Sequence, residues 1–208
     1  PLDADVVVLS RHALLQERAA AQGTALAVRI EEARGDLAAA ADRQQAAALR
    51  RDRAGEPRAV RAWARTARLH ARAGQKERAL AAVDRALELA DNDALRADLS
   101  FWRLHLRHGL LDALGAPALG THWPGDAFVT ETHTTMRGLQ GNPHVGTWLL
   151  TIGSRAVTAG HDETALDLYL LALRDPVLLD RARDDPDLWG GLLVAFPVAL
   201  RLGRLDEA

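Results

Sequence analysis

A short motif, in which a Gly is followed five residues later by an Ala, recurs in this chain of 208 residues. In each copy an Ala- and Leu-rich stretch with helical spacing leads into the Gly, which can adopt the left-handed conformation that ends a helix. A second apolar-periodic stretch follows, and its Ala allows two helix backbones to approach closely. The motif therefore predicts helical hairpins, each with a tight turn between antiparallel helices. The copies begin at Gly35, Gly74, Gly160 and Gly203.

The spacing of these glycines indicates a repeat architecture. They are separated by 39, 86 and 43 residues, and 86 is two steps of 43. A period near forty residues is typical of stacked helical hairpins. Only 4% of the residues are aromatic, and no strand alternation is evident, which favours helices over a sheet. We predict an all-α solenoid of about four to five repeats, forming one domain over residues 1–208 and belonging to a longer protein.

Residues 60–92 contain the most regular copy of the repeat. An early aromatic, a small residue, a turn Gly and two further small residues follow in order: Trp63, Ala67, Gly74, Ala79 and Ala86. This order resembles the tetratricopeptide repeat family, and residues 149–173 resemble it similarly. The resemblance implies that the first helix of each hairpin lines a peptide-binding groove. The period exceeds the 34 residues typical of that family, and it also fits HEAT-like arrays and the sensor regions of large bacterial signalling proteins.

Residues 115–146 interrupt this pattern, because they are rich in Gly and Pro among Thr and His residues. The period places another hairpin near this segment, with Phe101 and Trp102 on one helix and Met136 and Leu139 on another. We therefore predict a degenerate repeat with an inserted loop. Insertions in solenoids often gather on the binding face.

The sharpest polar pattern is the arginine stripe, which consists of Arg61, Arg65, Arg68 and Arg72. Offsets of four, three and four residues place these side chains along one side of a helix. Guanidinium groups bind carboxylates and phosphates through two parallel hydrogen bonds. We therefore predict that the stripe binds an acidic segment of a protein or peptide. The alternative is a solvated surface whose charges are neutralised by Glu and Asp of a neighbouring helix.

The charge along the chain is unevenly distributed. Residues 43–78 carry a net charge of +8, whereas residues 162–187 carry a net charge of −5. This asymmetry favours an anionic partner at the basic half, or association of two copies head to tail. Nucleic acid is not expected, because the total charge is −2 and no basic, aromatic-studded platform is evident.

Tryptophan and histidine residues suggest further sites. The pairs Trp63 and Trp102, and Trp148 and Trp189, are 39 and 41 residues apart, so we expect them to fill equivalent gaps between hairpins. Trp123 is the candidate for an exposed anchor to a partner, although packing of its loop onto the array is the alternative. His122 and His133 lie in the irregular segment and could line a small-molecule pocket beneath the 115–146 loop.

Several functions are not expected from this sequence. It has no Cys, which excludes disulfides and thiolate metal sites, and no phosphate-binding loop or hydrolase motif is present. A metalloenzyme that uses the histidines is the function that the sequence favours least. We predict no metal, no cofactor and no enzymatic activity. No apolar run is long enough to span a membrane, so we expect a cytoplasmic protein. The preferred function is a peptide-binding scaffold or sensor module of a bacterial-type signalling or regulatory protein.

Overall fold

The computed structural model describes residues 4–110, 123–139, 142 and 145–207. All regular elements in these ranges are helices, which confirms the predicted all-α class. By the packing of its residues the chain divides into two compact units. The N-terminal unit contains the described residues up to Leu89, and the C-terminal unit contains those from Ala90 onward. The sequence predicted one repeat domain, and we describe each unit by itself.

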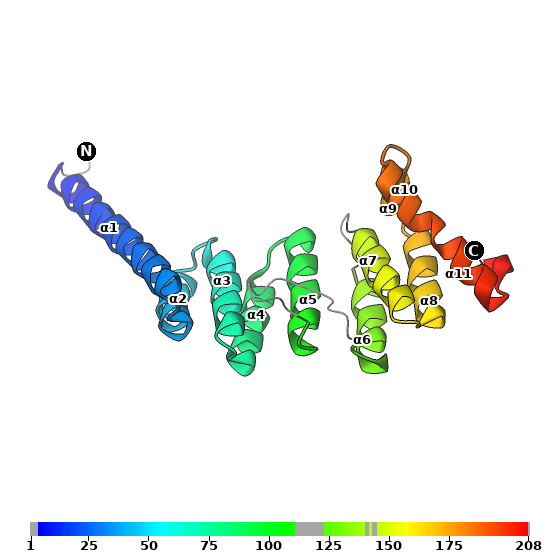
Figure 1. The fold of residues 1–208 in the computed structure, drawn as a ribbon. Coiled ribbons are helices and arrows are strands. Elements are labelled where there is room, and N and C mark those ends of the chain that lie inside the picture. The colour runs from blue at the N-terminus through cyan, green and yellow to red at the C-terminus, as the bar shows by residue number, and fades with distance from the viewer. Residues whose placement is uncertain (1–3, 111–122, 140–141, 143–144, 208) are drawn as a thin grey trace. The chain divides into compact units, whose positions relative to one another are not determined.

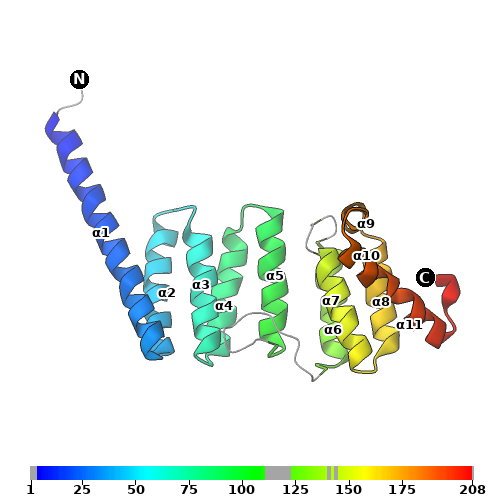
Figure 2. The same ribbon diagram turned by 45° about the horizontal axis from the view of Figure 1, so that its top comes forward.

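The N-terminal unit consists of four consecutive helices in its described part. They are α1 (Ala4–Arg34), α2 (Leu37–Arg53), α3 (Ala59–Arg72) and α4 (Lys76–Leu89). Each helix packs against the next one in the chain, and short turns join them (Figures 1 and 2). Figure 2 also shows that α1 extends well beyond the end of α2, which agrees with their lengths of 31 and 17 residues.

The predicted turn glycines all have the expected backbone conformation. Gly35, Gly74, Gly160 and Gly203 have φ angles of 80°, 72°, 81° and 70°. This left-handed region strains any residue with a Cβ atom, which is why Gly ends these helices. Asp36 then caps α2, because its carboxylate accepts a hydrogen bond from the backbone N–H of Ala39 at 3.2 Å. The hairpin turns are therefore specified locally by the sequence.

The interior of the N-terminal unit is built largely from alanine. The fully buried side chains with no exposed area include those of Ala40, Ala41, Ala48, Ala67, Ala79 and Ala86. Hydrogen bonds between side chains supplement the packing of these small residues. Trp63 Nε1 donates to Asp52 Oδ2 at 3.0 Å, and Arg85 donates to both Asp52 oxygens at 2.7 and 2.8 Å. These bonds lower the pKa of Asp52, that of Arg85 most strongly. They also join α2, α3 and α4.

The C-terminal unit has longer helices first and short ones last. It contains α5 (Asp93–Arg107), α6 (Asp126–Arg137), α7 (Val145–Thr158), α8 (Asp162–Leu173), α9 (Pro176–Ala182), α10 (Pro186–Leu193), α11 (Ala195–Leu202) and the 3-10 turn η1 (Leu205–Glu207). The segment predicted to be irregular thus contains α6 and the start of α7. Phe101 and Trp102 lie on α5 and Met136 on α6, as the period predicted, whereas Leu139 follows the end of α6.

Large apolar side chains fill the core of the C-terminal unit. Fully or almost fully buried residues include Phe128, Met136, Leu149, Ile152, Leu166 and Tyr169. Two glycines of α7 make room for this packing, because a Cβ atom at Gly153 would lie 2.9 Å from the Tyr169 ring and one at Gly146 would lie 2.6 Å from Leu178. Close contact of α7 with α8 and α9 therefore depends on the small residues of α7.

The tryptophan residues do not all occupy equivalent positions. Trp63 and Trp102 are buried and Trp148 is partly buried, stacked on Phe101 with ring centroids 4.3 Å apart. Trp189 differs, because about half of its side chain is exposed on α10. The prediction that all four fill gaps between hairpins is therefore wrong for Trp189. None of the described helices combines the length and hydropathy that crossing a membrane requires.

Candidate functional site: an arginine groove

Helix α3 carries the arginine stripe and orients its four members differently. Arg61 and Arg68 are exposed, whereas Arg65 and Arg72 are partly buried where α3 faces α1. The difference follows from helix geometry, since residues seven apart lie almost in line and residues four apart are displaced around the helix. The stripe is therefore two parallel pairs, Arg61 with Arg68 and Arg65 with Arg72.

One pair is neutralised within the unit. Glu32 on α1 accepts a hydrogen bond from Arg65 Nη2 at Oε2, at 2.9 Å, and from Arg72 Nη1 at Oε1, at 2.7 Å. A single carboxylate thus spans two guanidinium groups. The alternative interpretation from the sequence, in which a neighbouring helix neutralises the stripe, applies to these two residues.

The other pair has no such partner. Within the part of the chain that the structure describes, no carboxylate lies within ion-pair distance of Arg61 or Arg68, nor of Arg58 one turn before Arg61. Some other cations of residues 43–78 are paired, such as Arg43 with Glu31 at 2.6 Å and Arg51 with Glu56 at 3.7 Å. The side of α3 that carries Arg61 and Arg68 is therefore positively charged, without a compensating carboxylate among the described residues.

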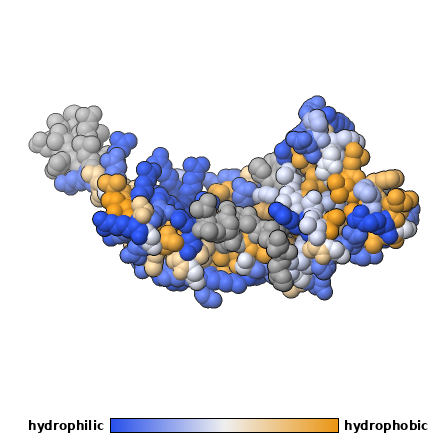
Figure 3. Space-filling view, viewed as in Figure 1, coloured by the Kyte–Doolittle hydropathy of each residue, from blue (hydrophilic) through white to orange (hydrophobic). Residues whose placement is uncertain are grey.

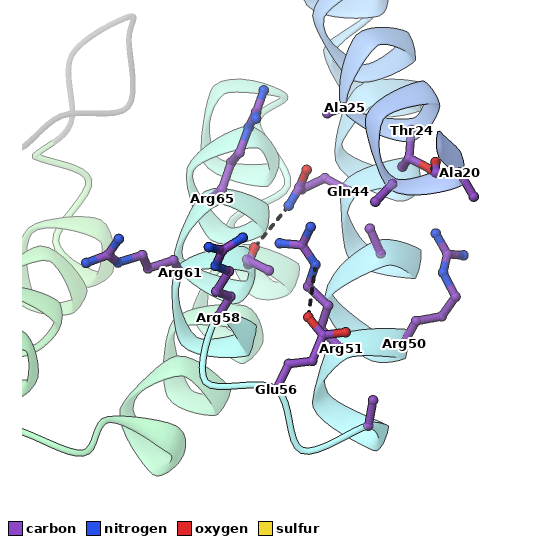
Figure 4. A pocket seen from close by; sticks show the side chains of 14 residues that line it. Ala20, Thr24, Ala25, Gln44, Arg50, Arg51, Glu56, Arg58, Arg61 and Arg65 are labelled. Carbon is purple, nitrogen blue, oxygen red and sulfur yellow. Dashed lines mark hydrogen bonds and ion pairs between the residues drawn. The ribbon is translucent and has the colours of Figure 1, made fainter. Parts of the chain in front are cut away.

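A hollow of about 650 Å³ lies between α1, α2 and α3 (Figure 4). Alanine side chains from all three helices line it, among them Ala21, Ala25, Ala47 and Ala62. Arginine side chains of α2 and α3 surround these small residues: Arg50, Arg51, Arg58, Arg61 and Arg65. We call this hollow, with its arginines, the arginine groove. It combines a shallow apolar floor with a cationic rim.

Two polar contacts shape the arginine groove. Gln44 is buried on α2 and donates from Nε2 to the backbone oxygen of Ala62 at 3.4 Å, which links α2 to α3. Arg51 lies 3.7 Å from Glu56 in the turn that follows α2, and both contacts are drawn in Figure 4. Among the described residues, Glu56 is the one carboxylate lining this hollow, so its lining leaves most of the rim charge uncompensated.

A second hollow of about 420 Å³ lies beside the first one. Glu32 and the whole arginine stripe line it, together with Ala64 and Leu69. Arg61 and Arg65 line both hollows. The first half of the predicted stripe is thus the shared wall of two adjacent depressions, and a ligand in either would meet Arg61.

The other predicted site residues lie in the C-terminal unit. Trp123 is partly buried, its ring stacks on His161 with centroids 5.3 Å apart, and it meets the edge of Phe128 at 6.1 Å. This is the packing role that the sequence left as the alternative to an exposed anchor. His133 lies on α6, and burial lowers its pKa. Neither residue lines the two hollows, and His122 falls outside the described residues.

The described residues do not form a metal-binding cluster. Among them, no three His, Asp or Glu side chains are grouped so that they could hold a metal ion. His108 contacts Glu131, with Nε2 and Oε2 2.9 Å apart, and Arg107 pairs with the same carboxylate. Glu131 on α6 thus binds two residues at the C-terminal end of α5.

Sequence reasoning missed some residues of the two hollows. Arg58 precedes Arg61 by three residues, so the helical spacing that identified the stripe could also have identified it. Glu32 could not be found in this way, because it lies 33 and 40 residues from the two arginines it binds. Its role depends on how α1 packs against α3.

Comparisons with known proteins return no relative for this chain: no family model, no curated protein and no solved structure matches it.

Proposed function

We propose that this chain is a binding module of a signalling or regulatory protein, which recognises an acidic protein segment through the arginine groove. In this proposal the helices form a tetratricopeptide-like array, and recognition rather than catalysis is its activity. Arg58 and Arg61 of the arginine groove supply the charge for the ligand together with Arg68 of the adjacent hollow, and the alanine floor accommodates its apolar side chains. The observation that carries the proposal is the lack of a carboxylate partner for these three arginines within the described residues.

The contrast between the two arginine pairs supports this proposal. Glu32 already gives Arg65 and Arg72 the bridging carboxylate that a pair of guanidinium groups seven residues apart can bind. Arg61 and Arg68 have the same spacing on the same helix. Arg58 and Arg61 are three residues apart, and like charges at that spacing repel one another, so an added carboxylate would relieve repulsion and gain charge-assisted hydrogen bonds. A segment with acidic residues at similar spacing would repeat the arrangement made by Glu32.

Apolar contact complements the charge. Small residues on the groove floor let a bound segment approach the helix backbones closely, and burial of its apolar side chains contributes roughly 25 cal/mol per Å². Charges on an exposed rim contribute more to the association rate and to selectivity than to affinity. The proposed ligand is therefore an amphipathic segment with both acidic and apolar residues, since neither kind of contact alone uses the whole groove.

A direct test uses a fluorescein-labelled peptide with alternating Glu and Leu pairs, followed by fluorescence anisotropy. We expect saturable binding that weakens as salt concentration rises. The double variant Arg61→Glu/Arg68→Glu should lose about tenfold or more in affinity, because it replaces attraction by repulsion at two contacts. A peptide with Lys in place of Glu should not bind.

The matched control is Arg155→Glu/Arg174→Glu, which makes the same change in net charge at two exposed residues of the C-terminal unit. It should retain the affinity of the unmodified chain. Circular dichroism should give the same helical content for both variants. If the groove variant and the control bind the acidic peptide equally well, the arginine groove is not the binding site and the proposal is wrong.

The alternative function predicted from the sequence is a small-molecule sensor with His122, His133 and Trp123 in its pocket wall. It receives no support from the two hollows, because Trp123 and His133 line neither of them, and His122 lies outside the described residues.

A further inference from the structure

Helices α10 and α11 expose a row of large apolar side chains. Trp189, Leu193, Phe196 and Leu200 follow one another at helical spacing, and their exposed fractions are 49%, 56%, 57% and 57%. Val194, between the two helices, has helical dihedral angles, so the row continues from one helix to the next. We call these four residues the apolar row. Figure 3 shows hydrophobic surface at this end of the chain.

The apolar row is too large to be ordinary surface. Single exposed apolar residues are common, but neighbouring ones in a row are typical of interaction sites. Helix α11 packs on α8 through its buried residues, which include Val198 and Ala199. The row is formed by the opposite, exposed residues of the same helix. It therefore lacks a covering element within the described part of its unit.

The surroundings of the apolar row are acidic. Asp184 and Asp187 are exposed near the start of α10, and the segment 162–187 carries a net charge of −5. Nearby cations are neutralised, since Arg201 binds Asp162 through two hydrogen bonds of 2.8 Å and Arg204 pairs with Glu163. Helices α10 and α11 thus present an apolar surface with carboxylates at one end that pair with no cation among the described residues.

This surface has the properties that the arginine groove requires of its ligand. The groove offers an alanine floor and unpaired arginines, whereas α10 and α11 offer large apolar side chains and unpaired aspartates. The charges are opposite, with +8 over residues 43–78 against −5 over residues 162–187. Large side chains on one surface and small ones on the other also provide steric complementarity.

We propose that the apolar row of one copy of this chain binds the arginine groove of a second copy. This inference rests on the proposed function, since it names the acidic segment that the groove recognises. The two surfaces differ, so the contact is heterologous and each bound copy leaves one groove and one row unoccupied. Association therefore proceeds head to tail and is not limited to a dimer.

Sedimentation velocity of the purified chain tests this arrangement. Up to concentrations on the order of 100 µM, where contacts of micromolar strength are populated, the weight-average sedimentation coefficient should rise with concentration. It should fall when salt is added, because the charges lie on exposed rims. The groove variant Arg61→Glu/Arg68→Glu and the row variant Leu193→Ser/Phe196→Ser should each remain monomeric alone.

The decisive sample is an equimolar mixture of these two variants. Each retains the surface that the other has lost, so the mixture should form a one-to-one dimer and nothing larger. Arg155→Glu/Arg174→Glu should associate like the unmodified chain. A monomeric unmodified chain overturns the inference, as does association of either variant alone or a mixture that remains monomeric. If circular dichroism shows that a double variant is not folded, Arg61→Ala and Leu193→Ala replace it with the same expectations.

The labelled acidic peptide separates this inference from the proposed function. The row variant should bind the peptide as the unmodified chain does, whereas the groove variant should not. Peptide binding by a chain that remains monomeric would overturn the inference and leave the proposed function intact. If the peptide does not bind and the arginine substitutions leave self-association unchanged, both the inference and the proposed function are wrong.

Discussion

The N-terminal and C-terminal units are both helical but are held together differently. Alanine forms most of the fully buried interior of the first, and polar contacts such as those of Asp52 join its helices. Phe128, Met136 and Tyr169 fill the second, where glycines on α7 admit large neighbours. Alanine buries little apolar area, so the N-terminal unit depends more on surface electrostatics. It is also the unit that carries the unpaired Arg58, Arg61 and Arg68 among the described residues.

The largest effect should come from the core of the C-terminal unit. Phe128→Ala removes a side chain with no exposed area and should lower the free energy of unfolding by about 3–5 kcal/mol, through lost burial and a residual cavity. Urea denaturation followed by circular dichroism measures this change. The matched control, Phe196→Ala, alters an exposed ring and should change stability by less than about 1 kcal/mol. If both variants lower the free energy of unfolding equally, buried aromatic side chains do not stabilise the C-terminal unit as the comparison of the two units states.

Acid should destabilise the C-terminal unit next most strongly. Burial lowers the pKa of His105 to about 4 from an ordinary value of 6.5, although its hydrogen bond with the oxygen of Phe101 acts in the opposite direction. Below pH 6.5 the unfolded chain therefore takes up a proton that the folded chain does not. Stability should be fully present above that pH and fall by about 3 kcal/mol as the pH approaches 4.

Urea denaturation at a series of pH values measures this loss. Burial also lowers the pKa of His70 and His133, so they contribute with the same sign. The variant His105→Gln should show a clearly smaller loss of stability between pH 7 and 4. An unchanged pH dependence in that variant would mean that His105 is not the main acid-sensitive group.

The smallest expected effect concerns the ion pairs of the N-terminal unit. Glu32→Gln removes the shared carboxylate of Arg65 and Arg72, both of which are partly exposed, so stability should fall by less than about 1 kcal/mol. The same change frees two more cations beside the hollows, and the acidic peptide should bind more tightly. Anisotropy measures the affinity, and Glu88→Gln, which removes an exposed partner of Arg85, is the control. Weaker peptide binding would show that Glu32 orients Arg65 for the ligand.

Local features of the fold could be predicted from the sequence, whereas pairings over long distances could not. The four turn glycines and the helices that precede them follow from short-range patterns, and the structure confirms them. The spacing of the arginine stripe correctly placed its residues on one helix. Spacing alone could not divide that stripe into paired and unpaired arginines, because the division depends on where Glu32 of α1 lies.

The tryptophan residues illustrate the same limit. A spacing close to the repeat period suggested equivalent environments for Trp148 and Trp189, but one is partly buried against Phe101 and the other is half exposed. The short helices α9, α10 and α11 break the regular period after Leu173. Burial depends on the neighbouring helices, which periodicity in the sequence does not identify.

The position of Asp52 has a consequence for how the N-terminal unit unfolds. In repeat arrays the stability is approximately a sum of local and nearest-neighbour contributions, and one end can unfold before the other. Asp52 binds Trp63 on the next helix and Arg85 on the helix after that, so its contacts reach beyond the nearest neighbour. Loss of α2 would leave the donors on both α3 and α4 without their acceptor. We therefore expect α2, α3 and α4 to unfold cooperatively, in a single step.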